Sequence, residues 1–443
     1  MKRFFYQPVI VLCFSFFLFS KTNAQGVGIN ATGAVPDPSA MLHVDAGTKG
    51  LLVTGILGGS VPDLGPGSRL MFYPAKAAFR AGNVTGTQWD NINVGLYSLA
   101  LGNNTIASGN NSIAMGINSI ANNSSSTAMG NTTVASGVNA SAMGIFTTAS
   151  GANSTAIGNN TQARGPSSTA MGNNTVALAT NSTAMGQSTT ATGQSATAMG
   201  VFTTASGSAS TAMGTNSVAS GSTSTAMGNN TVASATYSTA IGNNTTASGA
   251  SSTAMGNNVS TDLRAGAFVI GDNSTVTSAM TSSADNQMSM RFAGGYRLFS
   301  TLGLNFGVTL APGGGAWAQV SDKNKKENFV AIDAEVILKK VSALPLSKWN
   351  YKSQPASQKH VGPMAQDFYA AFQLDGIGND STINTGDIDG INMVAIQALE
   401  KRTADLKNEN DRLKASVAEL QKKFTDQQKL MEQILIDTKK NIK

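Results

Sequence analysis

The sequence predicts a mainly β protein: a parallel β-roll of 14-residue repeats, then a small α/β domain, then a C-terminal coiled coil. Three observations predict this architecture. Glycine recurs at every fourteenth position from Gly102 to Gly256, and alanine occupies every seventh position from Ala100 to Ala254. A heptad pattern of mostly apolar residues runs through residues 396–434. Because a strict period reflects one structural unit stacked many times, the repeats decide the fold class of the middle of the chain.

The composition also excludes an ordinary globular core over much of the length. Charged residues make up 12% of the 443 residues and aromatic residues 6%, while 47 residues are glycine. Ordinary domains contain roughly a quarter charged residues and more large apolar side chains. A chain with so few large apolar residues gains its stability by stacking repeats.

Residues 1–24 are predicted to be a secretory signal peptide. Lys2 and Arg3 precede the apolar stretch "PVIVLCFSFFLF", and Ala24 ends a small-residue cleavage site. The alternative is an uncleaved membrane anchor, but the apolar stretch is shorter than the ~20 residues that span a membrane. Because Cys13 is the sole cysteine, the mature chain would contain neither disulfides nor thiolate metal ligands.

The seven-residue alanine period does not indicate a coiled coil, because Gly, Asn, Ser and Thr dominate residues 98–258 and are poor in helix interiors. We expect each half-repeat to form a short strand that ends in a turn, so that one full repeat makes one coil. Stacking would pair each strand with its copy in the next coil, ~4.8 Å away, and give a rod of roughly 50 Å.

Side-chain alternation along a strand assigns the faces of this roll. The alanines would point inward, into a roll so thin that only methyl groups fit. Thr211 and Met213 would point outward in one half-repeat, and Val218 and Ser220 in the other. The outward methionines form a methionine stripe that one thin roll cannot bury, so we expect it to contact other copies of the chain. The stripe comprises Met115, Met129, Met143, Met171 and the corresponding residues of later repeats.

The motifs "NSIAMG", "NSTAIG" and "STAMGNNTVASG" resemble the head repeats of YadA-like trimeric autotransporter adhesins, and this resemblance covers residues 98–258. It implies a left-handed parallel β-roll that associates as a homotrimer and is displayed at a surface. Those adhesins end in a membrane anchor, which we do not expect in this chain.

The two flanks of the rod are predicted to be rich in β-structure. Residues 25–97 would form an N-terminal β cap over the open end of the roll, with a strand pair around Gly50. Residues 259–320 would form a β-rich connector that includes strands in "MRFAGGYRLFS" and "NFGVTLA".

The character of the chain changes at "SDKNKKENF", residues 321–329. Arg164 is the single charged residue between positions 98 and 258, whereas lysine and acidic residues are dense from Ser321 onward. In residues 321–395 we expect a helix in "AEVILKKVSALPL", a strand in "SKWNYKS" and a turn followed by a helix in "HVGPMAQDFYAAF". Residues 396–443 would form the coiled coil. Its a positions are Ile396, Thr403, Asn410, Val417, Phe424 and Met431, and its d positions are Leu399, Leu406, Leu413, Leu420, Gln427 and Ile434.

Four spaced motifs, "SDKNKKENF", "WNYKS", "HVGPMAQDF" and "GINMVAIQALE", together resemble the intramolecular chaperone domain of endosialidase-type phage tail spikes. The resemblance spans about residues 321–420. It implies a domain that trimerises, nucleates trimerisation of the β-rich stem before it and then cleaves itself off. It further implies a catalytic Ser321 with Lys326 as its partner, and a chaperone motif that includes Asp322, His360, Gly362 and Gln366.

The implied chemistry is reasonable, because a serine hydroxyl needs a base and a desolvated lysine can act as one. Residues five apart on one helix lie about 140° apart, so Ser321 and Lys326 must meet across a loop or between chains. We predict cleavage of the Val320–Ser321 bond by the serine oxygen, with the bond after Ser321 as the alternative. Lys323 and Lys325 are rival bases, and Asp322 would shape the turn.

Two alternatives compete for this segment. One is an inactive chaperone relic. The other is a helix start, in which Asn324 and Glu327 have capping-box spacing; such a cap can coexist with the catalytic pair.

For the whole protein we predict an exported, extracellular or cell-surface, trimeric fibre, resembling an adhesin or tail fibre, that binds a surface or host ligand which no motif identifies. The alternative is an ice-binding or surface-binding solenoid with an inactive chaperone tail, since threonine recurs at positions such as Thr197 and Thr211. The rod lacks the paired carboxylates of a carbohydrate hydrolase.

Four kinds of site or partner are not expected. With two histidines, His43 and His360, and no cysteine after the signal, we expect no metal site, and no cofactor is expected because no phosphate-binding loop is present. The lysines alternate with acidic residues, so no nucleic acid is expected, and no stretch after residue 24 is apolar enough to span a membrane.

Overall fold

A computed structural model describes residues 27–442, except residues 275–277, 305 and 375–379. The predicted signal peptide lies outside the described residues. The chain divides into two compact units, one up to Phe292 and one from Ala293 onward. Each unit is described by itself.

The first unit begins with two small pairs of strands. β1 (Val27–Asn30) pairs in parallel with β2 (Leu42–Asp45), and β3 (Gly67–Tyr73) pairs antiparallel with β4 (Ala78–Val84). The expected strand pair around Gly50 is wrong, because residues 46–66 contain no strand and β2 pairs with the segment before it. Short 3-10 helices follow β3 and β4, at Pro74–Lys76 and Asn91–Asn93.

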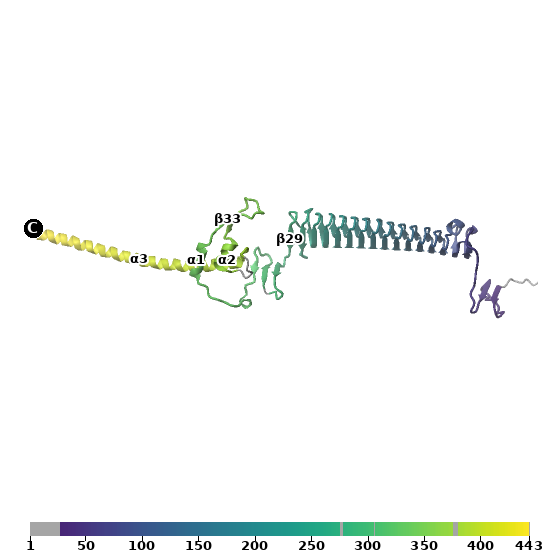
Figure 1. The fold of residues 1–443 in the computed structure, drawn as a ribbon, viewed down its shortest axis with the longest axis horizontal. Coiled ribbons are helices and arrows are strands. Elements are labelled where there is room, and N and C mark those ends of the chain that lie inside the picture. Colours follow the sequence, from purple (N-terminus) through teal and green to yellow (C-terminus); the bar gives the residue numbers. More distant parts are fainter. Residues whose placement is uncertain (1–26, 275–277, 305, 375–379, 443) are drawn as a thin grey trace, which may run out of the picture. The chain divides into compact units, whose positions relative to one another are not determined.

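The stacked coils of the β-roll follow, as predicted, and Figure 1 shows them as a single column of repeated turns. Each coil contains a five-residue strand and a two-residue strand, and each strand residue pairs in parallel with its equivalent in the next coil, as Met199 does with Met213. The longer strands are β5 (Leu99–Asn103), β7 (Ile113–Ile117), β9 (Thr127–Asn131), β11 (Ser141–Ile145), β13 (Thr155–Asn159), β15 (Thr169–Asn173), β17 (Thr183–Gln187), β19 (Thr197–Val201), β21 (Thr211–Thr215) and β23 (Thr225–Asn229). The shorter strands are β6 (Ile106–Ala107), β8 (Ile120–Ala121), β10 (Val134–Ala135), β12 (Thr148–Ala149), β14 (Gln162–Ala163), β16 (Val176–Ala177), β18 (Thr190–Ala191), β20 (Thr204–Ala205), β22 (Val218–Ala219) and β24 (Val232–Ala233).

The interior of the roll is filled by small side chains at two positions of each half-repeat. Every alanine of the seven-residue series, from Ala100 to Ala254, is fully buried. The position two residues before each alanine is also buried, and in most coils it carries Ser or Thr, such as Ser112 and Thr203. The expectation that only methyl groups fit is therefore incomplete. A hydroxyl is small enough for this space, and Ser112 Oγ donates a hydrogen bond to the Gly109 carbonyl at 2.6 Å.

The corners of the roll need backbone conformations that few residues tolerate. Every seventh residue from Asn104 to Asn258 has a positive φ near 55°, and asparagine is the commonest residue there. The asparagine side chains also link successive coils, since Asn230 Nδ2 donates to Asn244 Oδ1 at 2.9 Å and Asn244 Nδ2 to Asn258 Oδ1 at 3.0 Å. Where asparagines follow one another in successive coils, amide hydrogen bonds therefore link the corners along the stack.

Two large side chains fill the interior at the N-terminal end of the stack. Arg80 lies in register with Ala100 and is fully buried; its guanidinium donates to Ser98 Oγ at 2.8 Å and to the Ala107 carbonyl at 3.1 Å. Trp89 is also buried and donates from Nε1 to the Thr105 carbonyl at 2.9 Å. Burial lowers the pKa of Arg80 to about 10. These contacts support the prediction of a cap, which stays a prediction.

At the other end the sequence period is lost, but the stack continues. β25 (Thr239–Ala247) and β26 (Thr253–Ser260) are followed by β27 (Phe268–Gly271), β28 (Met280–Thr281) and β29 (Met288–Arg291), which pair in parallel on preceding strands. The predicted connector therefore begins as part of the roll, with longer loops between its strands. The sequence hides this because loop insertions break a fixed period while leaving the strand pairing intact.

The second unit combines a small sheet, a hairpin and three helices. β30 (Tyr296–Phe299), β31 (Gly307–Leu310) and β32 (Ala318–Gln319) form an antiparallel sheet. After the 3-10 helix Lys323–Lys325 come α1 (Ala334–Ala343), β33 (Ser347–Trp349), β34 (His360–Gly362), α2 (Ala365–Phe372) and α3 (Thr385–Asn441). The helices and β33 agree with the sequence prediction, whereas "HVG" is a strand paired with β33 and not a turn. An ion pair links α1 to α3: Arg402 on α3 donates a hydrogen bond from Nε to the Glu335 carboxylate on α1 at 2.9 Å.

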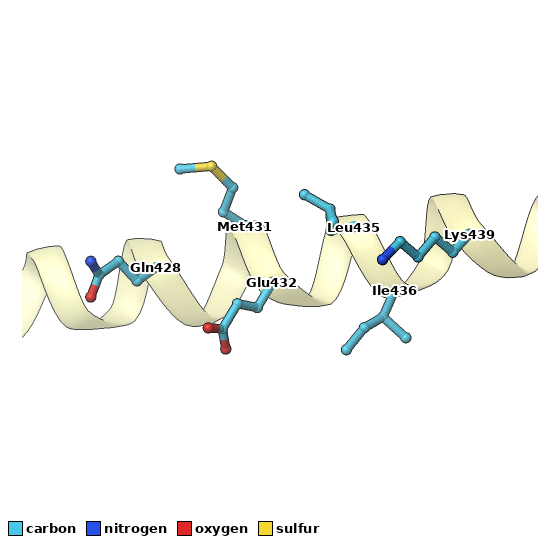
Figure 2. A pocket seen from close by; sticks show the side chains of 6 residues that line it. All are labelled: Gln428, Met431, Glu432, Leu435, Ile436 and Lys439. Atoms are coloured by element: carbon cyan, nitrogen blue, oxygen red, sulfur yellow. The ribbon is translucent and has the colours of Figure 1, made fainter.

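Helix α3 is 57 residues long and presents the predicted heptad residues on its surface. Leu406 and Leu413 are 69% and 56% exposed, so the seam has no partner within the described chain. Figure 2 shows Met431 and Leu435 projecting from one side of the helix and Ile436 from the opposite side. In the part of the chain that the structure describes, no helix is both long and apolar enough to cross a membrane. The coiled coil stays a prediction.

Candidate functional site

The candidate site lies where the small sheet of the second unit ends. Gln319 pairs with Val308 in the sheet, and the Val320 amide donates to the Gly307 carbonyl at 3.1 Å. The chain is therefore anchored by backbone hydrogen bonds directly before Ser321.

A tight turn follows Ser321 and brings Lys326 back to it. The Asp322 carboxylate accepts a hydrogen bond from the Asn324 amide at 2.9 Å and caps the 3-10 helix Lys323–Lys325. The Lys326 amide then donates to the Lys323 carbonyl at 3.2 Å. The spacing of Asn324 and Glu327 suggested a helix start in this segment. The structure has a single 3-10 turn here, and its cap is Asp322 and not Asn324.

Lys326 Nζ lies 2.6 Å from Ser321 Oγ. Of the two geometries that the sequence allowed, a loop or a contact between chains, the structure has the loop. Lys325 lines the same cavity, and Lys323 is not among its lining residues. Of the three lysines, Lys326 is the one for which the structure describes a hydrogen bond to the serine oxygen, and its role as the base stays a prediction.

A cavity of about 280 Å³ surrounds the pair. It is lined by Phe306, Gln319, Val320, Ser321, Asp322, Lys325, Lys326, Gly386 and Asp387. The first turn of α3 supplies Gly386 and Asp387, and the Gln319 side chain approaches the Gly386 backbone so closely that an added Cβ would lie 2.5 Å from Gln319 Oε1. Phe306, Gly386 and Asp387 were missed from the sequence, because no motif relates them to Ser321.

The pair is open to solvent in the described chain. Ser321, Asp322 and Lys326 are all exposed. A lysine amine accepts a proton only when it is neutral, and proteins favour the neutral form by removing the amine from water. A serine–lysine pair that acts as nucleophile and base would therefore need a further surface that covers it.

The other predicted motif residues form a separate cluster. The His360 ring stacks on Trp349 with centroids 4.8 Å apart, and its Nε2 is 2.9 Å from Gln354 Oε1. Gln366 lines a second cavity of about 570 Å³ together with Trp349 and Tyr351. Neither His360, Gly362 nor Gln366 lines the cavity at Ser321. Among the described residues, no group of three or more His, Cys, Asp or Glu side chains is arranged to hold a metal ion.

Two family models match the chain, in the order that the sequence motifs predicted. The model described as YadA head domain repeat matches the rod at residues 94–119, 107–133, 121–144, 135–161, 163–189, 191–217, 219–245 and 233–258. The model described as chaperone of endosialidase matches residues 321–376, which begin at Ser321. A comparison with curated proteins finds no match. The rod is thus similar to the heads of YadA-type adhesins, and the segment that begins at Ser321 is similar to the chaperone of endosialidase, which confirms both resemblances.

Proposed function

We propose that this protein is an exported, trimeric, fibre-like surface protein whose C-terminal unit drives trimer formation and then cuts itself off at Ser321. The observation that carries the proposal is the 2.6 Å contact between Lys326 Nζ and Ser321 Oγ, at the first residue of the segment similar to the endosialidase chaperone. The enzyme activity would be a serine peptidase activity directed at its own chain alone.

Two unpartnered surfaces support the trimer. The methionine stripe, including Met213, is half-buried on the outward side of the roll, and the leucines of α3 are exposed. Removing the rest of each methionine from water contributes roughly 1 kcal/mol, repeated at each coil that carries a methionine in this column. Parallel β-rolls assemble through non-local contacts and are slow to fold, so a helix that first sets chain number and register would prevent misassembly.

The proposed cleavage is an acyl shift followed by hydrolysis. The neutral Lys326 amine takes the proton of the Ser321 hydroxyl, and Oγ forms a bond to the carbonyl carbon of Val320. The C–N bond then breaks, the Ser321 nitrogen receives a proton, and an ester links Val320 to Oγ. Water hydrolyses the ester, which leaves a carboxylate on Val320 and a free amine and hydroxyl on Ser321.

The preceding carbonyl is favoured over the following one for a geometric reason. Attack on the Val320 carbonyl closes a larger and less strained ring than attack on the carbonyl of Ser321 itself. The backbone hydrogen bond from Val320 to Gly307 also holds this segment while the nucleophile approaches.

Trimer formation would switch the cleavage on. Because Ser321 and Lys326 are exposed in one chain, we propose that neighbouring chains cover the pair, exclude water and favour the neutral amine. Cleavage would then report correct assembly, and the neutral rod would be the mature product.

Mass spectrometry of freshly folded protein tests the proposal. We expect a first-order appearance of a fragment that starts at Ser321, without added protease. Ser321→Ala and Lys326→Ala should leave full-length trimer, whereas the matched controls Lys323→Ala and Lys325→Ala should still cut. An intact wild-type chain after complete trimer formation would refute self-cleavage and leave only the chaperone role. A fragment that starts at Asp322 would move the scissile bond to the other side of the serine.

A further inference from the structure

One corner of the roll carries an exception to its own pattern. The corner after each longer strand has its positive-φ position occupied by Asn, Thr or Ser in ten of the twelve coils and by Phe146 and Phe202 in the other two. The residue before each phenylalanine is also apolar, Ile145 or Val201. The two segments, "GIFTTASG" and "GVFTTASG", are nearly identical and lie four coils apart in the stack.

The phenylalanines are held in a backbone conformation that suits them poorly. Their φ angles are 53° and 55°, in the left-handed region, where a bulky side chain is a true outlier. This conformation costs an L residue about 1–2 kcal/mol, and asparagine tolerates it better. Their side chains remain 57% and 54% exposed, so burial within the chain offsets little of this cost. Strain that is retained without an internal reason points to a function outside the chain.

The surroundings of both rings are polar but uncharged. At the same corner one coil before and after, Phe146 has Thr132 and Asn160, and Phe202 has Ser188 and Asn216. The residues before the rings also have polar neighbours in the stack, since Ile145 lies between Asn131 and Asn159 and Val201 between Gln187 and Thr215. Arg164 is the single charged residue in residues 98–258. Each ring is therefore an exposed aromatic platform flanked along the rod by amide and hydroxyl groups.

We propose that this corner binds an extended, uncharged polysaccharide, with sugar rings stacked on Phe146 and Phe202 and sugar hydroxyls bound by the neighbouring amides. The flat face of an aromatic ring stacks on the apolar C–H face of a sugar ring. Side-chain amides both donate hydrogen bonds to sugar hydroxyls and accept hydrogen bonds from them. The lack of charge argues against nucleic acids and acidic polymers, whose recognition depends on cationic side chains. The inference rests on the proposed function, since it supplies the ligand of the displayed rod.

The spacing of the two platforms fits a polymer better than a single sugar. Four coils correspond to roughly 19 Å along the rod at ~4.8 Å per coil. One extended chain would reach both rings, and the second contact would form at a high effective concentration once the first is made. Single replacements should therefore each remove most of the binding.

The test uses the full chain and a panel of neutral polysaccharides, namely cellulose, mannan and a β-1,3-glucan, with heparin as the charged control. Binding is measured by co-sedimentation and by affinity electrophoresis. We expect at least one neutral polysaccharide to bind and heparin not to bind. Phe146→Asn with Phe202→Asn should weaken binding on the order of tenfold or more, as the loss of a stacking contact implies. The folded rod should lose no stability, because asparagine is the residue that most coils carry at this corner.

Tyr237→Ser is the matched control, since Tyr237 is 64% exposed and has a φ of 57° at the other corner. It should bind as the wild type does. No binding by any neutral polysaccharide, or equal binding by the double variant, would overturn the proposal. A double variant that no longer forms the trimer would also overturn it and assign the corner to a second copy of the chain. Trimer mass and self-cleavage are measured on the same samples, so failure of the proposed function is seen separately.

Discussion

Gly214 lies where two successive coils of the roll come closest, and Gly214→Ala tests the stacking directly. Its φ is 106°, and an added Cβ would lie 2.0 Å from the Gly228 carbonyl oxygen. Because real Cβ contacts under 3.0 Å are essentially never seen, the two coils would have to part by about 1 Å, the difference between these two distances. That movement stretches the hydrogen bonds between strands that lie ~4.8 Å apart.

The expected loss of stability has two sources. Overpacking costs about 1–3 kcal/mol, and the backbone conformation costs about 1–3 kcal/mol for a residue with a Cβ. The sum of about 2–6 kcal/mol corresponds to a fall in Tm of roughly 4–24 °C, at ~2–4 °C per kcal/mol for a unit of this size.

The assay is a thermal melt followed by the circular dichroism of the β-sheet. Gly315→Ala is the matched control, because it makes the same chemical change where nothing lies within 4 Å of the added atom. If Gly214→Ala lowers the Tm no more than this control does, the close approach of stacked glycines is wrong.

Three further predictions concern assembly and pH. Met213→Lys would place one unpaired charge from each protomer in the proposed interface; burial of such a charge is costly, and light scattering should show loss of the trimer. Normal assembly of that variant would place the interface elsewhere. Replacing Leu406 and Leu413 by Gln should abolish both trimer formation and the fragment that starts at Ser321; cleavage in a monomer would contradict assembly-dependent processing. The hydrogen bond from Arg402 lowers the pKa of Glu335 below its ordinary 4.5, so the pair's contribution to stability is present above that pH and lost as the pH falls through the lowered value. Glu335→Gln should therefore melt earlier than the wild type at pH 7, and this difference should shrink as the pH is lowered below 4.5, as measured by helical circular dichroism. A difference that stays as large in acid as at pH 7 would exclude the ion pair as its cause.

The periodic part of this protein could be read from sequence because each repeat meets the same surroundings. Ala212 faces the interior of the roll and Met213 faces outward, and the equivalent residues do the same in all the remaining coils. Once the inward and outward sides of one strand are assigned correctly, the assignment therefore holds for the whole rod. The helices of the C-terminal unit could also be predicted from sequence. The amphipathic pattern of α1 and the heptads of α3 are properties of single helices.

Tertiary structure decided what depends on residues far apart in the chain. The sequence placed Ser321 and Lys326 in one motif, and the structure adds that they meet across a 3-10 turn that Asp322 caps. The cavity around them needs Gly386, whose place near Gln319 comes from the start of α3. The sequence period did not reveal the two ends of the roll either. At one end β27 and β29 continue the stack through loops of irregular length. At the other end Arg80 fills the interior position equivalent to Ala100. A period reports interactions that recur at a fixed separation, whereas a cap, a cavity or an irregular coil forms once, between segments whose separation no repeat records.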